Sequence, residues 1–175
     1  MKRVSTGRVA AVIAIAVSIV LAASQAQADG KKKRSGTNTF VSQIQKNASP
    51  VGDVPGHEIA QQIALQHTTK ASDPMFMDMQ LTDYGQVDEN AGTGTHRGYS
   101  MGVLKDGSTS PARYEGTHKT TVKADGTWEA AYEGKYWLLP GTGKTKNAKG
   151  EGTYKCKYTA AGGACDWEEE SEYPQ

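Results

Sequence analysis

Apolar and polar side chains alternate along much of this chain, and a period of two residues is typical of β-strands that bury one face. Three Glu-Gly pairs, at residues 115–116, 133–134 and 151–152, lie inside such alternating stretches and recur every eighteen residues. This spacing suits neighbouring antiparallel strands of similar length joined by short turns. The pattern therefore predicts an all-β protein built from consecutive hairpins.

The clearest hairpin turns at residues 124–126, an Ala-Asp-Gly sequence with glycine where a three-residue loop needs a left-handed backbone. Folding the chain there places Val122 opposite Trp128 and His118 opposite Tyr132. Aromatic side chains then share one face and charged side chains share the other, which is consistent with the pleat of a strand pair. We expect the aromatic face to point toward the interior.

Two further alternating stretches precede this hairpin. In residues 75–82, methionines and a leucine alternate with Phe76 and three polar side chains, which predicts a strand whose next inward position is Asp83. After a loop, a second alternating stretch predicts a strand in which Arg97 and Tyr99 face inward and His96 faces outward.

The chain contains two cysteines, Cys156 and Cys165, and their separation of nine residues suits a disulfide across a hairpin. Setting the cysteines opposite each other also sets Tyr154 opposite Trp167. A loop this short restricts the unfolded chain by about 2–3 kcal/mol. The disulfide is therefore expected to fasten one hairpin, and the spacing is not that of a redox-active Cys-x-x-Cys site.

The strand count and the inward glycines predict how the sheet is arranged. Six strands are well indicated, and one or two weaker ones are expected at the amino end, where residues 57–65 fit a strand better than a helix. Glycines at the inward positions 116, 134 and 152 relieve crowding where the sheet bends. The chain is therefore expected to form an antiparallel barrel of six to eight strands, with a two-sheet sandwich as the alternative.

The amino-terminal residues divide into an export signal and a linker. Residues 1–28 have a basic start, an apolar run and a small-residue cleavage site, which together predict a secretory signal peptide. Residues 29–56 are rich in Lys, Ser, Asn, Gly and Pro, which predicts a flexible basic linker. Residues 57–175 are then the barrel domain, exported to the periplasm or the cell exterior. No later stretch is long and apolar enough to predict a membrane-spanning helix.

Charge limits the classes of partner. Removing the signal peptide changes the formal net charge from +1 to −2. This balance excludes general nucleic acid binding, which depends on neutralising phosphates. The local exception is a basic cluster, interpreted as a solvated tail, with weak contact to an anionic surface as the alternative. The cluster consists of Lys31, Lys32, Lys33 and Arg34.

A family resemblance rests on residues 92–157. This segment contains Gly-Thr-His-Arg-Gly-Tyr at 94–99, two Tyr-Glu-Gly triplets, and Gly-Thr-Gly-Lys at 141–144 leading to Lys-Gly-Glu-Gly-Thr-Tyr at 149–154. It resembles secreted bacterial proteins related to the allene oxide cyclase and dirigent-like barrels. The resemblance implies an eight-stranded barrel with a central cavity. Because the shared motifs are turn glycines and strand aromatics, it transfers no catalytic residue to this chain.

The inward positions predict a site for a small molecule, because polar groups converge in an otherwise apolar interior. A structural network of mutually satisfied groups is the alternative interpretation. No metal or other cofactor is expected, because the four histidines lack ligand spacing. Residues 141–145 only resemble a phosphate-binding loop, since Leu138 occupies the position of its first glycine. The candidate ligand-binding residues are Asp83, Arg97, Tyr99, Tyr114, His118, Trp128, Tyr132 and Tyr136.

Three functions fit this sequence. The first is a non-catalytic barrel that binds a small apolar or amphipathic molecule. The second is a cyclase or isomerase for an unsaturated carboxylate, with Arg97 holding the anion and His118 and Tyr132 moving protons. The third is a structural or surface-interaction protein whose barrel is filled by its own side chains.

Overall fold

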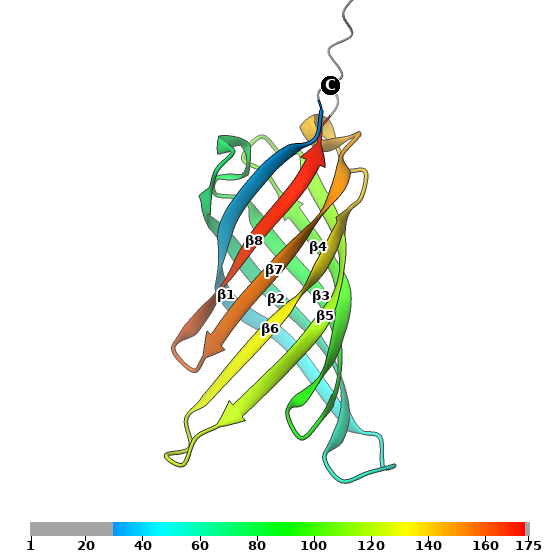
Figure 1. The fold of residues 1–175 in the computed structure, drawn as a ribbon, viewed down its shortest axis with the longest axis vertical. Coiled ribbons are helices and arrows are strands. Elements are labelled where there is room, and N and C mark those ends of the chain that lie inside the picture. Colours follow the sequence, from blue (N-terminus) through cyan, green and yellow to red (C-terminus); the bar gives the residue numbers. More distant parts are fainter. Residues whose placement is uncertain (1–29, 174–175) are drawn as a thin grey trace, which may run out of the picture.

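The computed structural model describes residues 30–173, which form a closed barrel of eight antiparallel strands in sequence order (Figure 1). The closed ring confirms the predicted barrel and excludes the sandwich. The predicted signal peptide, residues 1–28, lies outside the described residues. The strands are β1 (Lys32–Pro50), β2 (His57–Ala71), β3 (Gln80–Asn90), β4 (Thr93–Val103), β5 (Thr109–Val122), β6 (Trp128–Leu138), β7 (Lys149–Thr159) and β8 (Gly162–Glu172).

The first strand closes the barrel, so the prediction of a flexible linker over residues 29–56 is wrong. β1 pairs with β2 along one edge and with β8 along the other. Three register shifts, between residues 37 and 45, interrupt its pairing with β2. Such bulges break the period of two, and the cavity-facing side chains of β1 include the polar Asn38 and Gln43. The sequence therefore lacked the alternation by which the other strands were recognised.

Three of the four residues of the basic cluster, Lys32, Lys33 and Arg34, are likewise part of the sheet rather than of a solvated tail, and Lys31 directly precedes them. Lys32, Lys33 and Arg34 pair in the ladder with residues of the acidic strand β8. Arg34 is largely buried, and its Nε donates to Asp73 Oδ2 at 2.9 Å. Opposite charges on adjacent strands stabilise a ladder, so this cluster contributes to closing the barrel.

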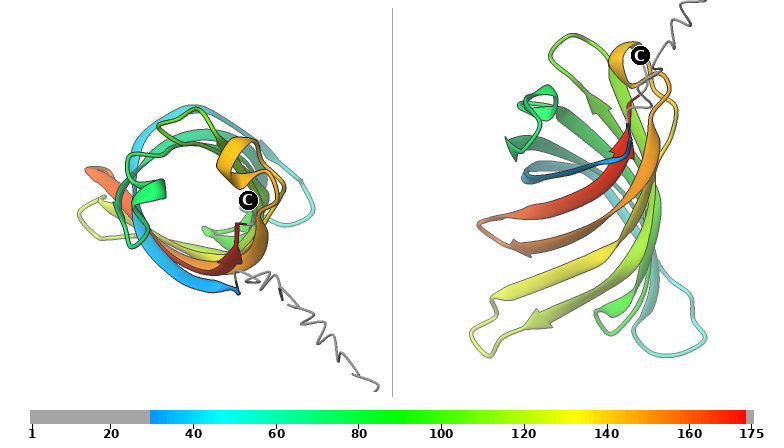
Figure 2. Two further views of the ribbon diagram at one scale, coloured as in Figure 1. Left: turned by 90° about the horizontal axis from the view of Figure 1, so that it is seen from above. Right: turned by 45° about the horizontal axis from the view of Figure 1, so that its top comes forward.

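Two short 3-10 helices, η1 (Pro74–Phe76) and η2 (Gly143–Thr145), lie at the end of the barrel where the described chain finishes (Figure 2). Helix η1 replaces the start of the strand predicted at residues 75–82. Asp73 caps it by accepting a hydrogen bond from the Met75 amide at 3.0 Å, and Pro74 fixes its first turn. This local capping overrides the alternation, and β3 begins only at Gln80.

Both predicted carboxyl-terminal hairpins are confirmed. In the β5–β6 hairpin, Val122 pairs with Trp128 and His118 with Tyr132, and the turn contains Gly126 with φ of +80°. In the β7–β8 hairpin, the paired residues Cys156 and Cys165 form a disulfide. Both hairpins therefore have the register that the aromatic and cysteine positions indicated.

The predicted orientation of β4 is wrong. Tyr99 is 57% exposed and Arg97 is exposed, whereas His96 is buried. The inward positions of this strand are mostly glycines, and large side chains from neighbouring segments occupy the space beside them. A Cβ on Gly98 would lie 2.8 Å from Tyr114 Cζ, and one on Gly102 would lie 2.6 Å from Met79 Sδ. An inner face built from glycine carries no apolar signal, so the alternation was assigned to the wrong face.

The same glycine-to-ring packing recurs around the barrel. The Tyr114 hydroxyl also reaches β3, where a Cβ on Gly85 would lie 2.7 Å from it. A Cβ on Gly152 would overlap the Tyr136 ring, and one on Gly36 would overlap the Trp167 ring. Rings that cover strand glycines are a known device for building curved sheets. Inward glycines therefore allow large rings to fit inside this narrow barrel.

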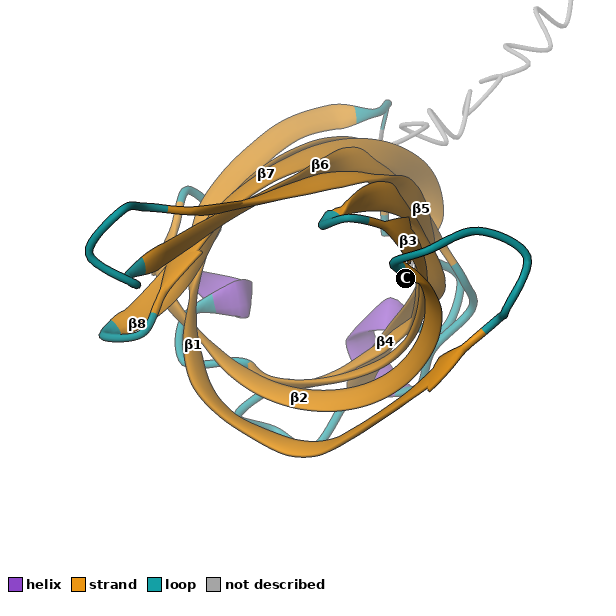
Figure 3. Cartoon of the chain, turned by 90° about the horizontal axis from the view of Figure 1, so that it is seen from below, coloured by secondary structure: helices purple, strands orange, loops and turns teal. Residues whose placement is uncertain are grey.

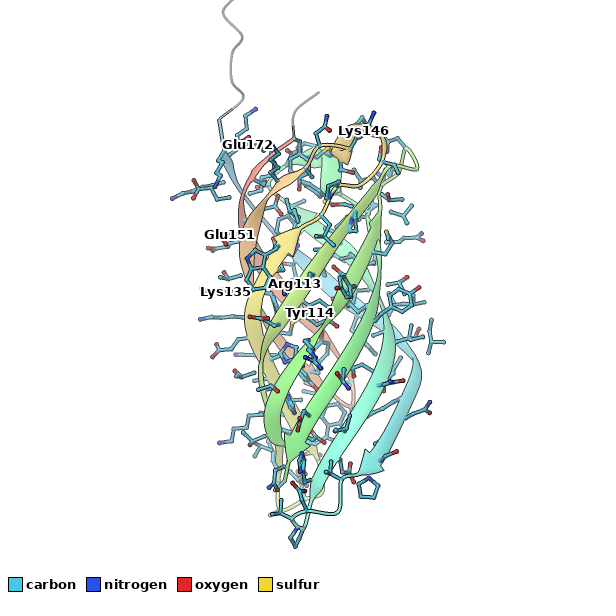
Figure 4. The ribbon with its side chains drawn as sticks, turned by 90° about the vertical axis from the view of Figure 1, so that its right-hand side faces the viewer. Arg113, Tyr114, Lys135, Lys146, Glu151 and Glu172 are labelled. Atoms are coloured by element: carbon cyan, nitrogen blue, oxygen red, sulfur yellow. A yellow bond between two sulfur atoms is a disulfide. The ribbon has the colours of Figure 1, made fainter. Side chains whose placement is uncertain are left out.

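The outer face of the carboxyl-terminal half is charged. Lys135 on β6 and Glu151 on β7 project away from the barrel wall (Figure 4). The Arg113 guanidinium lies 4.4 Å from the centre of the Trp137 ring on the same outer face. Apart from the outward ring of Trp137 and the inward carboxylate of Glu169, charged groups lie outside and rings lie inside, as the alternation of β5 to β8 predicted.

We expect Gly134→Val to lower the free energy of unfolding by about 2–3 kcal/mol. A Cβ at this position would overlap the Glu115 carbonyl oxygen and would lie 2.5 Å from Tyr154 Oη. Urea denaturation followed by circular dichroism measures the change. Gly30→Val is the matched control, because a Cβ there meets nothing within 4 Å. Equal urea midpoints for the two variants would contradict the glycine-to-ring packing.

Candidate ligand cavity

The barrel encloses a cavity of about 420 Å³. Figure 3 views the ring of strands from the end opposite the two short helices. Near this end, the wall residues Trp128, Thr120 and Thr159 keep substantial exposed surface. The cavity therefore opens between the hairpin loops at this end.

The other end of the barrel is closed by an apolar cluster. Its buried members are Phe76, Met79, Leu81, Leu104, Ala148, Trp167 and Tyr173. Phe76 from η1 packs edge-on against Trp167 at 5.9 Å between ring centres. This cluster forms the floor of the cavity.

A buried carboxylate near the floor has a full set of partners. Glu169 accepts hydrogen bonds from the Tyr136 hydroxyl at 3.1 Å, from the Ser171 hydroxyl at 2.6 Å and from the Tyr173 hydroxyl at 3.1 Å. These hydrogen bonds compensate for burying the charge. Glu169 therefore belongs to a satisfied structural network.

The middle of the cavity is surrounded by aromatic rings from four strands. Tyr132 on β6 stacks on His118 at 5.1 Å and meets His96 edge-on at 5.1 Å. On β7, Tyr154 lies 6.1 Å from the Tyr114 ring, and Tyr158 lies 5.6 Å from Tyr132. Edge-to-face contacts of this kind hold rings in fixed positions. The rings thus form a rigid apolar wall with hydroxyl groups at its surface.

A histidine and a tyrosine join opposite parts of this wall. His96 Nε2 on β4 and the Tyr154 hydroxyl on β7 share a hydrogen bond of 2.5 Å. Burial, assisted by the nearby His118, lowers the pKa of His96 to about 4. His96 is therefore neutral at physiological pH and adds no positive charge to the cavity.

Asp83 is the least compensated charged group on the wall. Its one hydrogen-bond partner among residues 30–173 is the Gln66 side-chain amide on β2. Burial raises the pKa of Asp83 to about 6, although the hydrogen bond from Gln66 acts in the opposite direction. The surface that Asp83 retains faces the cavity, which it lines. A carboxylate with a single neutral partner is thus presented to whatever occupies the cavity.

The structure brings five of the eight predicted site residues onto the cavity wall. The wall includes Asp83, Tyr114, Trp128, Tyr132 and Tyr136. Arg97 and Tyr99 instead lie on the outer face, where Arg97 donates to Gln86 Oε1 at 3.0 Å. Of the two charged groups predicted to face inward, Asp83 does so and Arg97 does not, and the hydrogen-bond partner of Asp83 is Gln66.

His118 is inside the barrel but does not line the cavity. Its side chain has no exposed surface and lies behind the Tyr132 ring. Its Nε2 donates to Glu89 Oε2 at 2.8 Å, and Glu89 is 21% exposed. His118 therefore orients Tyr132 and fixes Glu89 rather than contacting the cavity directly.

Several wall residues were missed by sequence reasoning. His96 was assigned to the outside with the rest of β4. Phe40 lies on β1, which was interpreted as a linker, and Gln66 lies on β2, whose inner face carries alanines and glutamines rather than the isoleucines. Tyr154 and Tyr158 could have been found, because each is two residues from Cys156 and therefore lies on the same face of the strand.

Within residues 30–173 no cluster of three or more histidine, cysteine or acidic side chains could hold a metal ion. The same part of the chain has no helix of the length and apolarity needed to cross a membrane.

No protein-family model matches the chain, and no curated protein matches it. The resemblance to the allene oxide cyclase group stays a prediction.

We expect Asp83→Asn to stabilise the protein at pH 7 by about 2–3 kcal/mol and to have little effect at pH 3.5. Because the pKa of Asp83 in the folded state is raised to about 6, the folded protein holds this proton more tightly than the unfolded chain does. The ionised Asp83 carboxylate therefore destabilises the folded protein. This effect is absent below the pKa of Asp83 in the unfolded chain and complete above its pKa in the folded protein. Urea titrations of both proteins between pH 3.5 and 7.5 measure the difference. A difference that does not change with pH would contradict this assignment.

Proposed function

We propose that the barrel binds one small apolar or amphipathic molecule in its central cavity. The observation that carries this proposal is the cavity itself, about 420 Å³ in volume and lined mainly by aromatic and aliphatic side chains. Small-molecule sites are typically clefts of about 300–1,000 Å³ with apolar walls and a few polar groups. Asp83 and His96 supply such polar groups here.

The remaining hypotheses have less support. A barrel filled by its own side chains would leave no cavity of this size. The isomerase hypothesis required an inward arginine to hold a carboxylate. Because Arg97 is exposed on the outer face, that proposed mechanism loses its anion-binding group.

Export of the domain fits the same proposal. Cys156 and Cys165 form a disulfide, and disulfides persist mainly in oxidising compartments. The predicted signal peptide would deliver the chain to such a compartment. A binding protein there could hold a poorly soluble molecule against its largely apolar cavity wall.

N-phenyl-1-naphthylamine, a neutral apolar dye, provides the test. We expect saturable binding of one dye per chain with a rise in its fluorescence, because the dye exchanges water for the apolar wall. Ala130→Trp should weaken this binding at least tenfold, because Ala130 is buried and lines the cavity.

Ala131→Trp is the matched control, since the neighbouring Ala131 is exposed on the outer face. Circular dichroism establishes that both variants keep the barrel. If the wild-type protein binds the dye and the two variants bind it equally, the proposal is contradicted. Native mass spectrometry of the exported protein would identify any molecule that copurifies.

A further inference from the structure

The wall of the cavity has an acidic bias. Two carboxylates, Asp83 and Glu169, line it, and within the described part of the chain its one lysine or arginine is Lys46. Lys46 is exposed and lies near the end of β1, beside the opening. His96 is neutral near pH 7 because burial lowers its pKa to about 4. The deeper cavity therefore contains acidic groups and no cation.

The two carboxylates differ in how far they are compensated. Glu169 accepts from three hydroxyl groups near the floor. Asp83 has only the Gln66 amide, and Gln66 Oε1 next to it is buried without a hydrogen-bond partner among the described residues. An amide oxygen adds to the negative potential of the carboxylate. A charge held inside a protein without a counter-charge is costly, so this position favours a positively charged occupant.

Tyrosine rings surround the same position. Tyr114, Tyr154 and Tyr158 are close enough to Asp83 for its charge to raise the pKa of each hydroxyl, in addition to the larger effect of burial. The Tyr114 hydroxyl reaches across β4 to Gly85, the next inward residue after Asp83 on β3. Aromatic rings attract organic cations through their π-electrons, and groups of rings are used to bind quaternary ammonium groups. The wall thus combines one carboxylate with several rings.

We propose that the ligand is an organic cation, whose ammonium group lies beside Asp83 within the tyrosine rings. This inference rests on the proposed binding function and adds the chemical class of the ligand. An ammonium group supplies the missing counter-charge, while the apolar part of the molecule contacts the remaining rings. An anionic ligand would face the Asp83 carboxylate without a compensating cation. A neutral ligand would leave that carboxylate with Gln66 alone.

A matched pair of probes separates charge from shape. The cation is (4-hydroxyphenyl)trimethylammonium, and 4-tert-butylphenol is its neutral counterpart of nearly the same size. Isothermal titration calorimetry at pH 7.5 measures both affinities on the full exported chain. We expect the cation to bind at least tenfold more tightly than the neutral phenol, because only the cation compensates Asp83 and interacts with the ring faces.

Two variants then locate the charge. Asp83→Asn keeps the size of the side chain and removes its charge, so it should weaken binding of the cation until the preference over the neutral phenol is lost. Glu133→Gln removes the same charge from the outer face of β6, where Glu133 is exposed, and should preserve the preference. Unfolding curves establish that both variants are folded.

The outcomes separate the two proposals. If the neutral phenol binds as well as the cation or better, the cation inference is wrong and the binding function stands. If the preference survives in Asp83→Asn, the cation is held elsewhere and the inference is also wrong. If the cation does not bind while the naphthylamine dye does, the inference is wrong and the binding function stands. If the dye and both probes all fail to bind, the inference and the proposed function are both contradicted.

Discussion

The contact between an inward glycine and an aromatic ring from a neighbouring strand determines how this barrel is built. Eight strands enclose a narrow interior, and a Cβ at Gly98, Gly134 or Gly152 would collide with the rings that occupy it. Each ring lies over a glycine instead of in the centre. The rings are therefore held against the wall, and space remains along the axis for the cavity. Glycine is a costly residue in a strand, so its repetition at inward positions marks a structural requirement.

The cavity follows from this arrangement, and its chemistry follows from what each strand adds to it. The apolar cluster and the Glu169 network close one end with all their polar groups paired. In the middle, Asp83 lies among tyrosine rings with one neutral partner. Mutually satisfied groups require no ligand, whereas an undercompensated carboxylate that faces an open cavity keeps acceptor positions for an occupant. The hydrogen bonds of Glu169 thus indicate a structural role, whereas the incomplete set at Asp83 makes it the candidate binding residue.

The sequence predicted the carboxyl-terminal half of the fold well and the amino-terminal half poorly. The β5–β6 and β7–β8 registers and the disulfide follow from aromatic and cysteine positions that alternate with charged residues. β1 was missed because bulges interrupt its period and its inner face is partly polar. β4 was assigned in reverse because Tyr99 and its neighbours lie outside while glycines lie inside. Hydrophobic alternation identifies a strand, but it identifies the buried face only when that face carries side chains. The site inherited these errors, which is why Arg97 was included and His96 was not.

The orientation of β4 is the point on which the ring packing and the cavity both depend. Nuclear Overhauser contacts measured on isotope-labelled protein test it directly. The account requires contacts between the ring protons of Tyr114 and the α-protons of Gly98, since a Cβ on Gly98 would lie 2.8 Å from Tyr114 Cζ. It also requires that the Tyr99 ring make no contact with the Tyr114 ring. Contacts between those two rings, with none from Tyr114 to Gly98, would reverse the strand and contradict the account.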